Sequence, residues 1–307
     1  MMMNGYLAFI ASLVLAVKAY QVPATYPNIS SCALQTPTYS CENTTVISNT
    51  CCSPTPGGLV LVTQFWSRYT GLEKQGQLLP KGSWTIHGLW PDNCDGSFEQ
   101  YCDLSRQYDP DPSPSTLPDG TIVPAYKGPG VNTFVESFGR DDLLDFMNTY
   151  WINQGAPNAD FWAHEFSKHA TCTSTFDVSC YGASYRRHEE VVNFFDAVVR
   201  GFHHYPTFDI LASAGIVPSN RTTYTLDQIQ TAIATQTGAI PYLGCSPNAT
   251  ILSEVWYFNH VYGTEQYGTY KAIDSTTKSS CSKTEPIWYY ERTPSSEHEV
   301  RKTGRGW

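Results

Sequence analysis

The stretch Leu59-Val60-Leu61-Val62-Thr63-Gln64-Phe65-Trp66 decides the fold class, because its β-branched and aromatic residues predict a strand. The strand is short and fully apolar on one face, so we expect it near the centre of a sheet. Trp84-Thr85-Ile86-His87-Gly88-Leu89-Trp90 alternates in the same way and predicts a second strand. This strand is expected to end at Pro91, which cannot donate a hydrogen bond to a neighbouring strand.

Helical patterns follow these two strands along the chain. Apolar residues recur at helical spacing in four segments, and a strand pattern then returns. The expected helices are 140–151, 160–171 with Asp160 as N-cap, 184–202, and 226–235 after an N-cap at Thr225, and the returning strand is 251–261. Residues 21–58 are rich in Pro, Ser, Thr and Cys, and 109–130 reads as a surface loop because it contains six prolines. These patterns predict a mixed, loop-rich fold.

The composition limits the class of protein further. The chain has 307 residues, of which 41% are hydrophobic and 15% charged, so it is neither disordered nor a coiled coil. Its formal net charge of −9 excludes a protein that holds nucleic acid on a broad basic surface. No internal repeat or long linker divides the chain, so one domain is expected over 20–290, followed by a flexible tail over 291–307.

The first 19 residues read as a secretory signal peptide. The run from Tyr6 to Val17 is almost wholly apolar, and Val17-Lys18-Ala19 offers small residues for cleavage after Ala19. No later stretch reaches the ~18 apolar residues that a membrane helix needs. We therefore expect a soluble, exported protein with no membrane partner.

The cysteines fit export to an oxidising compartment. There are ten, an even number, and none forms a Cys-x-x-Cys pair, so five disulfides are expected and the residues by themselves leave the connectivity open. The cysteines are Cys32, Cys41, Cys51, Cys52, Cys94, Cys102, Cys172, Cys180, Cys245 and Cys281. Four sequons, at Asn28, Asn43, Asn220 and Asn248, are candidate glycan acceptors, and about half of them are expected to be occupied.

Two segments concentrate the residues that are useful for acid–base chemistry. His87 lies at the end of the second predicted strand, and the predicted helix carries His164, Glu165, Lys168 and His169. At ~100° per residue these four helical side chains span an arc of about 140°. One helix face therefore presents two imidazoles, a carboxylate and an ammonium group. The remaining histidines, His188, His203, His204, His260 and His298, are interpreted as structural or surface residues.

This mixture of side chains suits phosphoryl transfer at an RNA 2′-hydroxyl without a metal. The reaction needs a base for the hydroxyl proton, an acid for the departing 5′-oxygen, and positive charge against the phosphorane. Two histidines can fill the first two roles. Lys168 and His164 can meet the phosphate oxygens, while Glu165 can orient the substrate or hold a histidine protonated.

Two other interpretations stay open from the residues alone. His164-Glu165 followed by His169 is superficially similar to the helical zinc-hydrolase motif, but that motif spaces its histidines four residues apart. Here the spacing is five residues, which puts the imidazoles about 140° apart on an ideal helix. The second alternative is a secreted binding or toxin-like protein that kept the fold and lost catalysis.

Residues Trp84 to Asp92 and Phe161 to Thr171 resemble the two signature blocks of the ribonuclease T2 family of secreted acid ribonucleases. The adjacent Cys51-Cys52 pair and the ten-cysteine layout are similar to its fungal branch. The resemblance implies an α+β fold with a central antiparallel sheet and packed helices. It also implies five disulfides, which pair Cys32 with Cys52, Cys41 with Cys94, Cys51 with Cys180, Cys102 with Cys172, and Cys245 with Cys281.

The same resemblance assigns roles to the site residues. It implies that His169 takes the 2′-hydroxyl proton, that His87 protonates the leaving group, and that a 2′,3′-cyclic phosphate forms. His164, Glu165 and Lys168 take the family's phosphate-contacting, acidic and basic positions. The residues implied to contact bases are Trp90, Asp92, Phe98 in place of a tyrosine, Phe161, Gln64 and Gln154.

A secreted endoribonuclease is therefore expected, and it acts outside the cell or in an acidic vacuolar or lysosomal compartment. Its substrate is single-stranded RNA and not DNA, it requires no metal or other cofactor, and it is a monomer. The acidic net charge does not conflict with this substrate, because unstructured RNA needs only a short site of stacking rings and a few cations.

Overall fold

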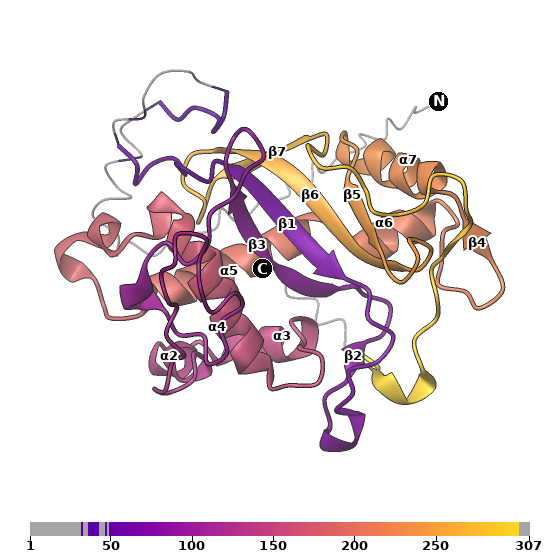
Figure 1. Cartoon of the computed structure of the whole chain (residues 1–307), viewed down its shortest axis with the longest axis horizontal. Coiled ribbons are helices and arrows are strands. Elements are labelled where there is room, and N and C mark those ends of the chain that lie inside the picture. The colour runs from indigo at the N-terminus through magenta and orange to yellow at the C-terminus, as the bar shows by residue number, and fades with distance from the viewer. Residues whose placement is uncertain (1–31, 33–35, 43–46, 48, 301–307) are drawn as a thin grey trace, which may run out of the picture.

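The computed structural model describes residues 32, 36–42, 47 and 49–300, which form an antiparallel sheet with helices packed on it. The sheet has the order β3 (Thr85–Asp92), β1 (Leu59–Phe65), β6 (Leu252–Tyr262) and β5 (Tyr242–Cys245), and β7 (Thr269–Ile273) pairs with β6. Figure 1 shows these strands side by side at the centre of the molecule. The predicted α+β fold with a central antiparallel sheet is confirmed.

The first predicted strand lies inside the sheet, as its apolar sequence indicates. β1 pairs with β3 on one side and with β6 on the other, and Leu59, Val60, Leu61 and Val62 are all buried. The prediction that β3 ends at Pro91 is wrong by one residue, because Pro91 pairs with Val60 inside the strand and β3 continues to Asp92. β3 lies at the end of the sheet order, and an edge strand has an unpaired side where a missing N–H costs no hydrogen bond.

Six α-helices are described, and their bounds follow the predicted pattern with some shifts. They are α2 (Asn132–Ser137), α3 (Asp141–Tyr150), α4 (Asn158–Lys168), α5 (Glu189–His204), α6 (Thr207–Ser213) and α7 (Leu226–Thr237). Thr225 caps α7 by a capping box with Gln228, as its sequence indicates. Asp160 is not the N-cap of α4, because the helix already begins at Asn158 after Pro157. Asp160 lies instead in the first turn, where a carboxylate faces the positive end of the helix dipole.

Short 3-10 segments replace some of the predicted helical residues. They are η1 (Glu73–Gln75), η2 (Leu104–Arg106), η3 (Ala170–Cys172), η4 (Ser174–Phe176), η5 (Val178–Ser184) and η6 (Pro294–Ser296). α4 thus ends at Lys168 rather than at residue 171, and α5 begins only at Glu189. His188 directly precedes α5 and has a positive φ of 71°. Because this left-handed conformation is incompatible with a right-handed helix, α5 cannot start before Glu189.

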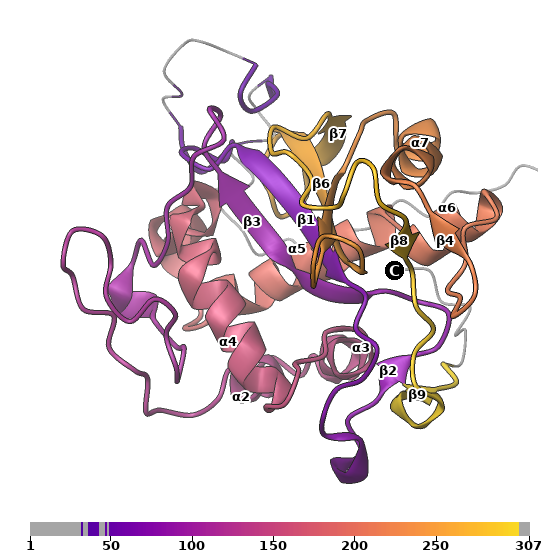
Figure 2. The same ribbon diagram turned by 45° about the vertical axis from the view of Figure 1, so that its right-hand side comes forward.

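Among the described helices, α5 lies on one face of the sheet and α4 lies beside its β3 edge (Figures 1 and 2). In both ribbon views α5 runs behind the sheet. The apolar residues of α5 join β1 and β3 in the main core, with Val62, Ile86, Phe194 and Phe195 all buried. This packing leaves the junction of α4, β3 and the end of β1 as the place where polar side chains gather.

All five disulfides have the pairing that the family resemblance implies. They join Cys32 with Cys52, Cys41 with Cys94, Cys51 with Cys180, Cys102 with Cys172, and Cys245 with Cys281. Cys51–Cys180 spans 129 residues and Cys102–Cys172 spans 70, so both close long loops. Closing long loops restricts the unfolded chain strongly.

The predicted flexible tail is wrong for residues 291–300. Within it, β9 (Glu297–His298) pairs in parallel with β2 (Leu79–Pro80), and the backbone N–H of Thr293 donates to the carbonyl of Arg68 over 3.0 Å. Buried Arg292 donates to the carbonyl oxygens of Ser67 and Ser83. These hydrogen bonds fix a charged residue that the sequence predicts to be solvent-exposed. A second small sheet pairs β4 (Thr223–Tyr224) with β8 (Ile287–Trp288). Residues 301–307 lie outside the described part of the chain.

Three further sequence predictions meet the structure only in part. The signal peptide and the sequons at Asn28 and Asn43 lie outside the described residues, whereas Asn220 and Asn248 are exposed, as glycan acceptors must be. Among the described residues no helix is both long and apolar enough to cross a bilayer. The loop 109–130 is not entirely at the surface, because Asp109 and Val123 are buried.

A buried carboxyl group outside the sheet makes the stability of the fold depend on pH. Burial raises the pKa of Glu265 from 4.5 to about 8, and its Oε2 has no hydrogen-bond partner within the described structure. The folded chain therefore holds this proton over a pH range in which the unfolded chain has released it. Stability falls as pH rises from the unfolded to the folded pKa, by up to about 1.4 kcal/mol per pH unit.

We expect Glu265→Gln to remove this component, so that the variant loses less stability than the parent between about pH 5 and pH 8. The measurement is denaturant unfolding of both proteins at several pH values in that range. Exposed Glu285→Gln serves as the control and leaves the slope of stability against pH unchanged. A Glu265→Gln slope equal to that of the parent contradicts the prediction.

Candidate active site

His87 lies on β3, where contacts from two other strands and from Trp151, the residue after α3, fix it. Its Nδ1 lies 2.6 Å from Oε1 of Glu254 on β6, and its ring stacks on Phe65 of β1 with centroids 3.8 Å apart. Its backbone carbonyl accepts a hydrogen bond of 2.9 Å from Nε1 of Trp151. The side chain is 17% exposed, so the ring reaches solvent while its plane is held.

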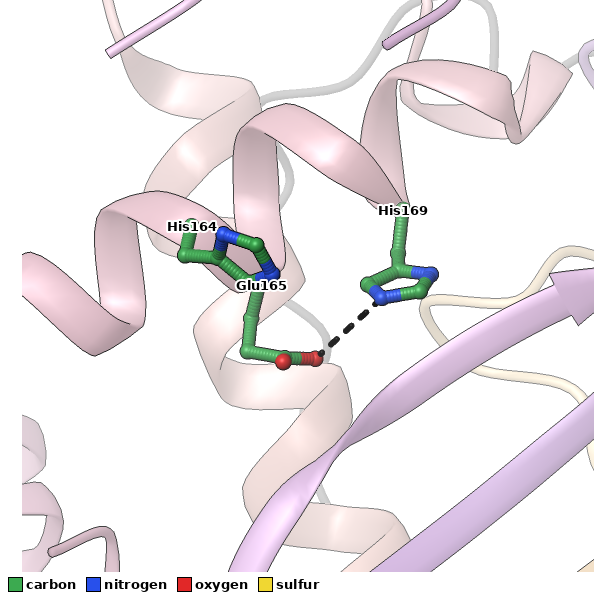
Figure 3. Close-up of side chains that lie close together, drawn as sticks. All are labelled: His164, Glu165 and His169. Atoms are coloured by element: carbon green, nitrogen blue, oxygen red, sulfur yellow. Dashed lines mark ion pairs between the residues drawn. The ribbon is translucent and has the colours of Figure 1, made fainter. Parts of the chain in front are cut away.

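Glu165 on α4 connects His87 with His169. Its Oε1 lies 3.7 Å from Nε2 of His87, and its Oε2 lies 3.9 Å from Nε2 of His169. Figure 3 shows Glu165 and His169 turned toward each other from neighbouring turns at the end of the helix. Nε1 of Trp90 donates to Oε2 over 2.8 Å, and the Glu165 side chain is only 1% exposed. One buried carboxylate therefore faces two imidazoles, one with each oxygen.

His164 is held by a carboxylate from the loop that follows β3. Its Nδ1 lies 2.7 Å from Oδ2 of Asp109, which also accepts a hydrogen bond of 2.9 Å from the hydroxyl of Tyr101. Asp109 is buried, and the hydrogen bonds from His164 and Tyr101 help to lower its pKa even though burial opposes them. Asp109 thus holds Nδ1 of His164, which leaves Nε2 of the same ring to contact a ligand.

Burial disfavours the charged forms of both Glu165 and His169, so it shifts their two pKa values in opposite directions. Burial raises the pKa of Glu165, although His87, His164 and the Trp90 hydrogen bond favour its ionised form. Burial also lowers the pKa of His169 well below 6.5, and the positive charge of Lys168 adds to this effect. His169 is therefore the imidazole that stays neutral toward acidic pH.

The two helical histidines are closer together than an ideal helix predicts. One potential ligand atom from each of His164, Glu165 and His169 lies within 4.8 Å of the others, and the two rings are 6.4 Å apart. His169 follows the last residue of α4 with φ −108° and ψ −54°, which departs from helical geometry. The prediction that the five-residue spacing holds the two imidazoles too far apart to share a metal ion is therefore wrong. The half-buried Lys168, whose positive charge acts on both Glu165 and His169, disfavours a cation there.

Three of the residues implied to contact a base lie together at the end of β3. Trp90 stacks on His169 with ring centroids 5.0 Å apart, so one of its faces is already used. Asp92 forms an isolated bridge with Phe98, whose side chain is 63% exposed. Burial raises the pKa of Asp92 to about 7, so this carboxyl group can donate as well as accept a hydrogen bond near neutral pH.

Of the other three implied base contacts, one lies beside His87, one is buried and one is exposed. Phe161 on α4 lies on the other flank of His87, with ring centroids 5.7 Å apart. Gln64 is wholly buried, its amide donates to the carbonyl of Tyr205, and its oxygen accepts from Thr207, so the structure contradicts a base contact for it. Gln154 is exposed and donates to the backbone carbonyl of Tyr69.

Sequence reasoning missed the two carboxylates that hold the outer histidines. Glu254 lies 167 residues from His87 along the chain, and Asp109 lies 55 residues from His164. The available signals were weak, namely a charged residue in an apolar strand and an acidic residue in a proline-rich loop. A disulfide-linked α+β fold in which two imidazoles face the two oxygens of one buried carboxylate is an arrangement typical of acid–base enzymes.

Comparison with known proteins identifies the family to which the chain belongs. The family model of the Ribonuclease T2 family matches residues 57–284. Ribonuclease T2 of Aspergillus oryzae is 37% identical over 253 residues, which cover 82% of this chain and 81% of that protein. Ribonuclease Trv of Hypocrea rufa is 40% identical over 252 residues, which cover 82% of this chain and 94% of that protein. The Ribonuclease T2-like 1-A of Candida albicans is longer, and a 40% identical match covers 57% of it.

A solved structure agrees with these relatives. The crystal structure of Actibind, described as a T2 ribonuclease, superimposes with a TM-score of 0.69 at 36% identity. The match covers 83% of this chain and 96% of Actibind. The chain belongs to the ribonuclease T2 family, and it is an endoribonuclease.

Proposed function

We propose that this endoribonuclease cleaves single-stranded RNA by metal-independent transphosphorylation through a 2′,3′-cyclic phosphate, with His169 as general base and His87 as general acid. The observation that carries the proposal is the buried Glu165, whose two oxygens lie 3.7 Å and 3.9 Å from these two imidazoles. Such a pair, on either side of one reacting phosphate, meets the need for one proton acceptor and one proton donor.

The assignment of the base rests on protonation. A base must be neutral at the pH of the reaction, and burial together with Lys168 lowers the pKa of His169. In the first step Nε2 of His169 takes the proton of the 2′-hydroxyl, and the 2′-oxygen then attacks phosphorus. The bond between phosphorus and the 5′-oxygen breaks, and a proton from Nε2 of His87 neutralises the departing oxygen. Hydrolysis of the cyclic phosphate reverses the two roles, with water in place of the departing hydroxyl.

Three further side chains surround the position of the phosphate. His164 is held by Asp109 through Nδ1, which leaves its Nε2 to donate to a phosphate oxygen. Lys168 supplies a positive charge to the phosphorane, and Glu165 keeps the imidazoles in place. Trp90 lies beside His169, and Asp92 and Phe98 lie near it at the end of β3. Phe161 lies beside His87. We therefore place the base on one side of the scissile bond near Asp92, and the base on the other side near Phe161.

Three observations support action outside the cytoplasm. The ten cysteines form five disulfides, the N-terminus has the pattern of a signal peptide, and two sequons lie on the described surface. Disulfides persist in oxidising compartments, so secretion or delivery to an acidic vacuole or lysosome fits this chain. We propose that the enzyme acts there as a monomer.

Hydrolysis of defined substrates tests the proposal. We expect single-stranded RNA to be cleaved in excess EDTA with a 2′,3′-cyclic phosphate as the first product, whereas DNA of the same sequence stays intact because it lacks the attacking hydroxyl. Activity that EDTA abolishes and zinc restores would instead identify a metal hydrolase built on His164, Glu165 and His169. Failure to cleave RNA under either condition would identify a non-catalytic binding protein.

The pH profile tests the cause of the low pKa of His169. The acid limb of kcat/KM for a dinucleotide should lie below pH 6.5, the ordinary pKa of histidine. Lys168→Gln removes a positive charge that lowers this pKa, so the acid limb should move to higher pH. Exposed Lys127→Gln is the matched control and keeps the limb of the parent. An acid limb at the same pH in the parent and in Lys168→Gln would contradict the assignment.

A further inference from the structure

Glu254 makes a close contact with a catalytic histidine from an element that the signature blocks do not include. Its Oε1 lies 2.6 Å from Nδ1 of His87, which is the distance of a charge-assisted hydrogen bond. Glu165 also faces His87, but at 3.7 Å from Nε2, which is too long for a hydrogen bond. The carboxylate bonded to His87 is therefore Glu254 on β6 and not Glu165 on α4.

The sheet places Glu254 accurately beside His87. In the register of β1 and β6, Glu254 pairs with Phe65, and Phe65 stacks on the imidazole of His87. On its other side Glu254 pairs with Gly244 of β5, where an added Cβ would lie 2.9 Å from Cβ and 3.1 Å from Oε2 of Glu254. The absence of a side chain at Gly244 leaves the space that the carboxylate occupies.

We propose that Glu254 is a positioning residue for His87, which holds Nδ1–H and thereby directs the proton-bearing Nε2 at the leaving oxygen. This inference rests on the proposed role of His87 as general acid. Phe65 sets the plane of the ring, and the hydrogen bond from Trp151 anchors the backbone carbonyl, but neither contact selects which ring nitrogen faces the substrate. The bond to Glu254 makes that selection, since an ionised carboxylate accepts a hydrogen bond from Nδ1–H and has no hydrogen to donate.

The proton count follows from this arrangement. Charged His87 carries a proton on each nitrogen, gives the Nε2 proton to the 5′-oxygen as the P–O bond breaks, and keeps the Nδ1 proton, which stays hydrogen-bonded to Glu254. The neutral ring that remains has a bare Nε2, ready to accept a proton from water when the cyclic phosphate is hydrolysed. Glu254 takes up no proton in either step.

The groups that face His87 come from several elements. Glu254 contacts it from β6, Glu165 from α4, and Phe65 and Phe161 lie against the ring. The Trp90 ring lies edge-on to the His87 ring, with centroids 4.6 Å apart. His169, at the end of α4, faces the other oxygen of Glu165. Glu165 and His169 are shared with the rest of the site, whereas the described contacts of Glu254 lead to His87 alone among the catalytic groups.

The experiment compares two substrates that differ in their need for an acid. A dinucleotide releases a basic 5′-alkoxide that requires protonation, whereas a uridine 3′-(4-nitrophenyl phosphate) releases a stable phenolate. We expect Glu254→Gln to lower kcat on the dinucleotide about 10- to 100-fold with KM unchanged, and to alter the nitrophenyl reaction by less than about threefold. Glu254→Asp, which keeps a carboxylate, should recover part of the lost rate.

Two controls accompany these variants. Ser253→Ala, at the neighbouring position of β6, should match the parent on both substrates, and thermal unfolding should show that Glu254→Gln remains folded. The ¹⁵N shifts of the neutral His87 ring give a readout independent of turnover. The parent should show a protonated Nδ1, and Glu254→Gln should show an increased share of the Nε2–H form.

His87→Ala on the same two substrates separates failure of this inference from failure of the proposed function. If His87→Ala is impaired only on the dinucleotide but Glu254→Gln is impaired equally on both substrates, His87 is the acid and Glu254 does not position it. An unchanged tautomer in Glu254→Gln overturns the inference in the same way. If His87→Ala is impaired equally on both substrates, His87 is not the acid, and both proposals are wrong.

Discussion

His169→Ala should lower kcat/KM for RNA on the order of 10²–10⁴-fold, the range that loss of a general base produces. The effect is large because burial and the charge of Lys168 lower the pKa of His169, so its imidazole stays neutral and available as a base at acidic pH. His87→Ala should produce a loss of the same order, because the departing 5′-oxygen then lacks its proton. The measurement is kcat/KM on a dinucleotide for both variants and the parent.

The fold should survive both changes. His169 lies at the C-terminal end of α4 and His87 on an edge strand, and both side chains are partly exposed, at 12% and 17%. His298, which lies on β9 and outside the site, provides the matched control, and His298→Ala should keep the activity of the parent. Near-normal turnover by either catalytic variant, with the same unfolding transition, would refute the role given to that residue.

Gly88→Ala should cost on the order of 10²-fold in kcat/KM, although it adds only one methyl group at a residue with no chemical role. The added Cβ would lie 1.9 Å from Oε2 of Glu165 and 2.8 Å from Nε1 of Trp90. These two atoms form the 2.8 Å hydrogen bond that holds the carboxylate. The methyl group must displace Glu165, and with it the alignment of both imidazoles, because the site is buried and leaves little room.

The expected loss in Gly88→Ala is one of geometry, so the variant should fold with a modest decrease in stability, about 1–3 kcal/mol for an overpacked position. Gly130→Ala is the control, since Gly130 is exposed and its added Cβ would meet chiefly the flexible end of Asn132. Parent-like kcat/KM in Gly88→Ala would show that the position of Glu165 does not limit the reaction. A crystal structure of the variant would show the displaced carboxylate directly.

Local patterns were sufficient for the elements that are regular over several residues. The apolar run at 59–66 became β1, the helical spacing at 140–151 became α3, and Thr225 capped α7 as predicted. Each of these depends on neighbours within a few residues, which is the range that periodicity and capping report. The errors occurred at boundaries that distant partners decide, such as Pro91 on its edge strand and Arg292, whose guanidinium binds carbonyl groups more than 200 residues away.

The sequence by itself determined which side chains are chemically competent. His87, His164, Glu165, Lys168 and His169 lie in two short segments, and the family resemblance gave their roles and the five cysteine pairs. Only the tertiary structure decided how these groups are arranged and charged. It added Glu254 and Asp109 from distant segments, turned His169 toward Glu165, and removed Gln64 from the site by burying it. It also lowered the pKa of His169, chiefly by burial, which arises only when α4 packs against the edge of the sheet.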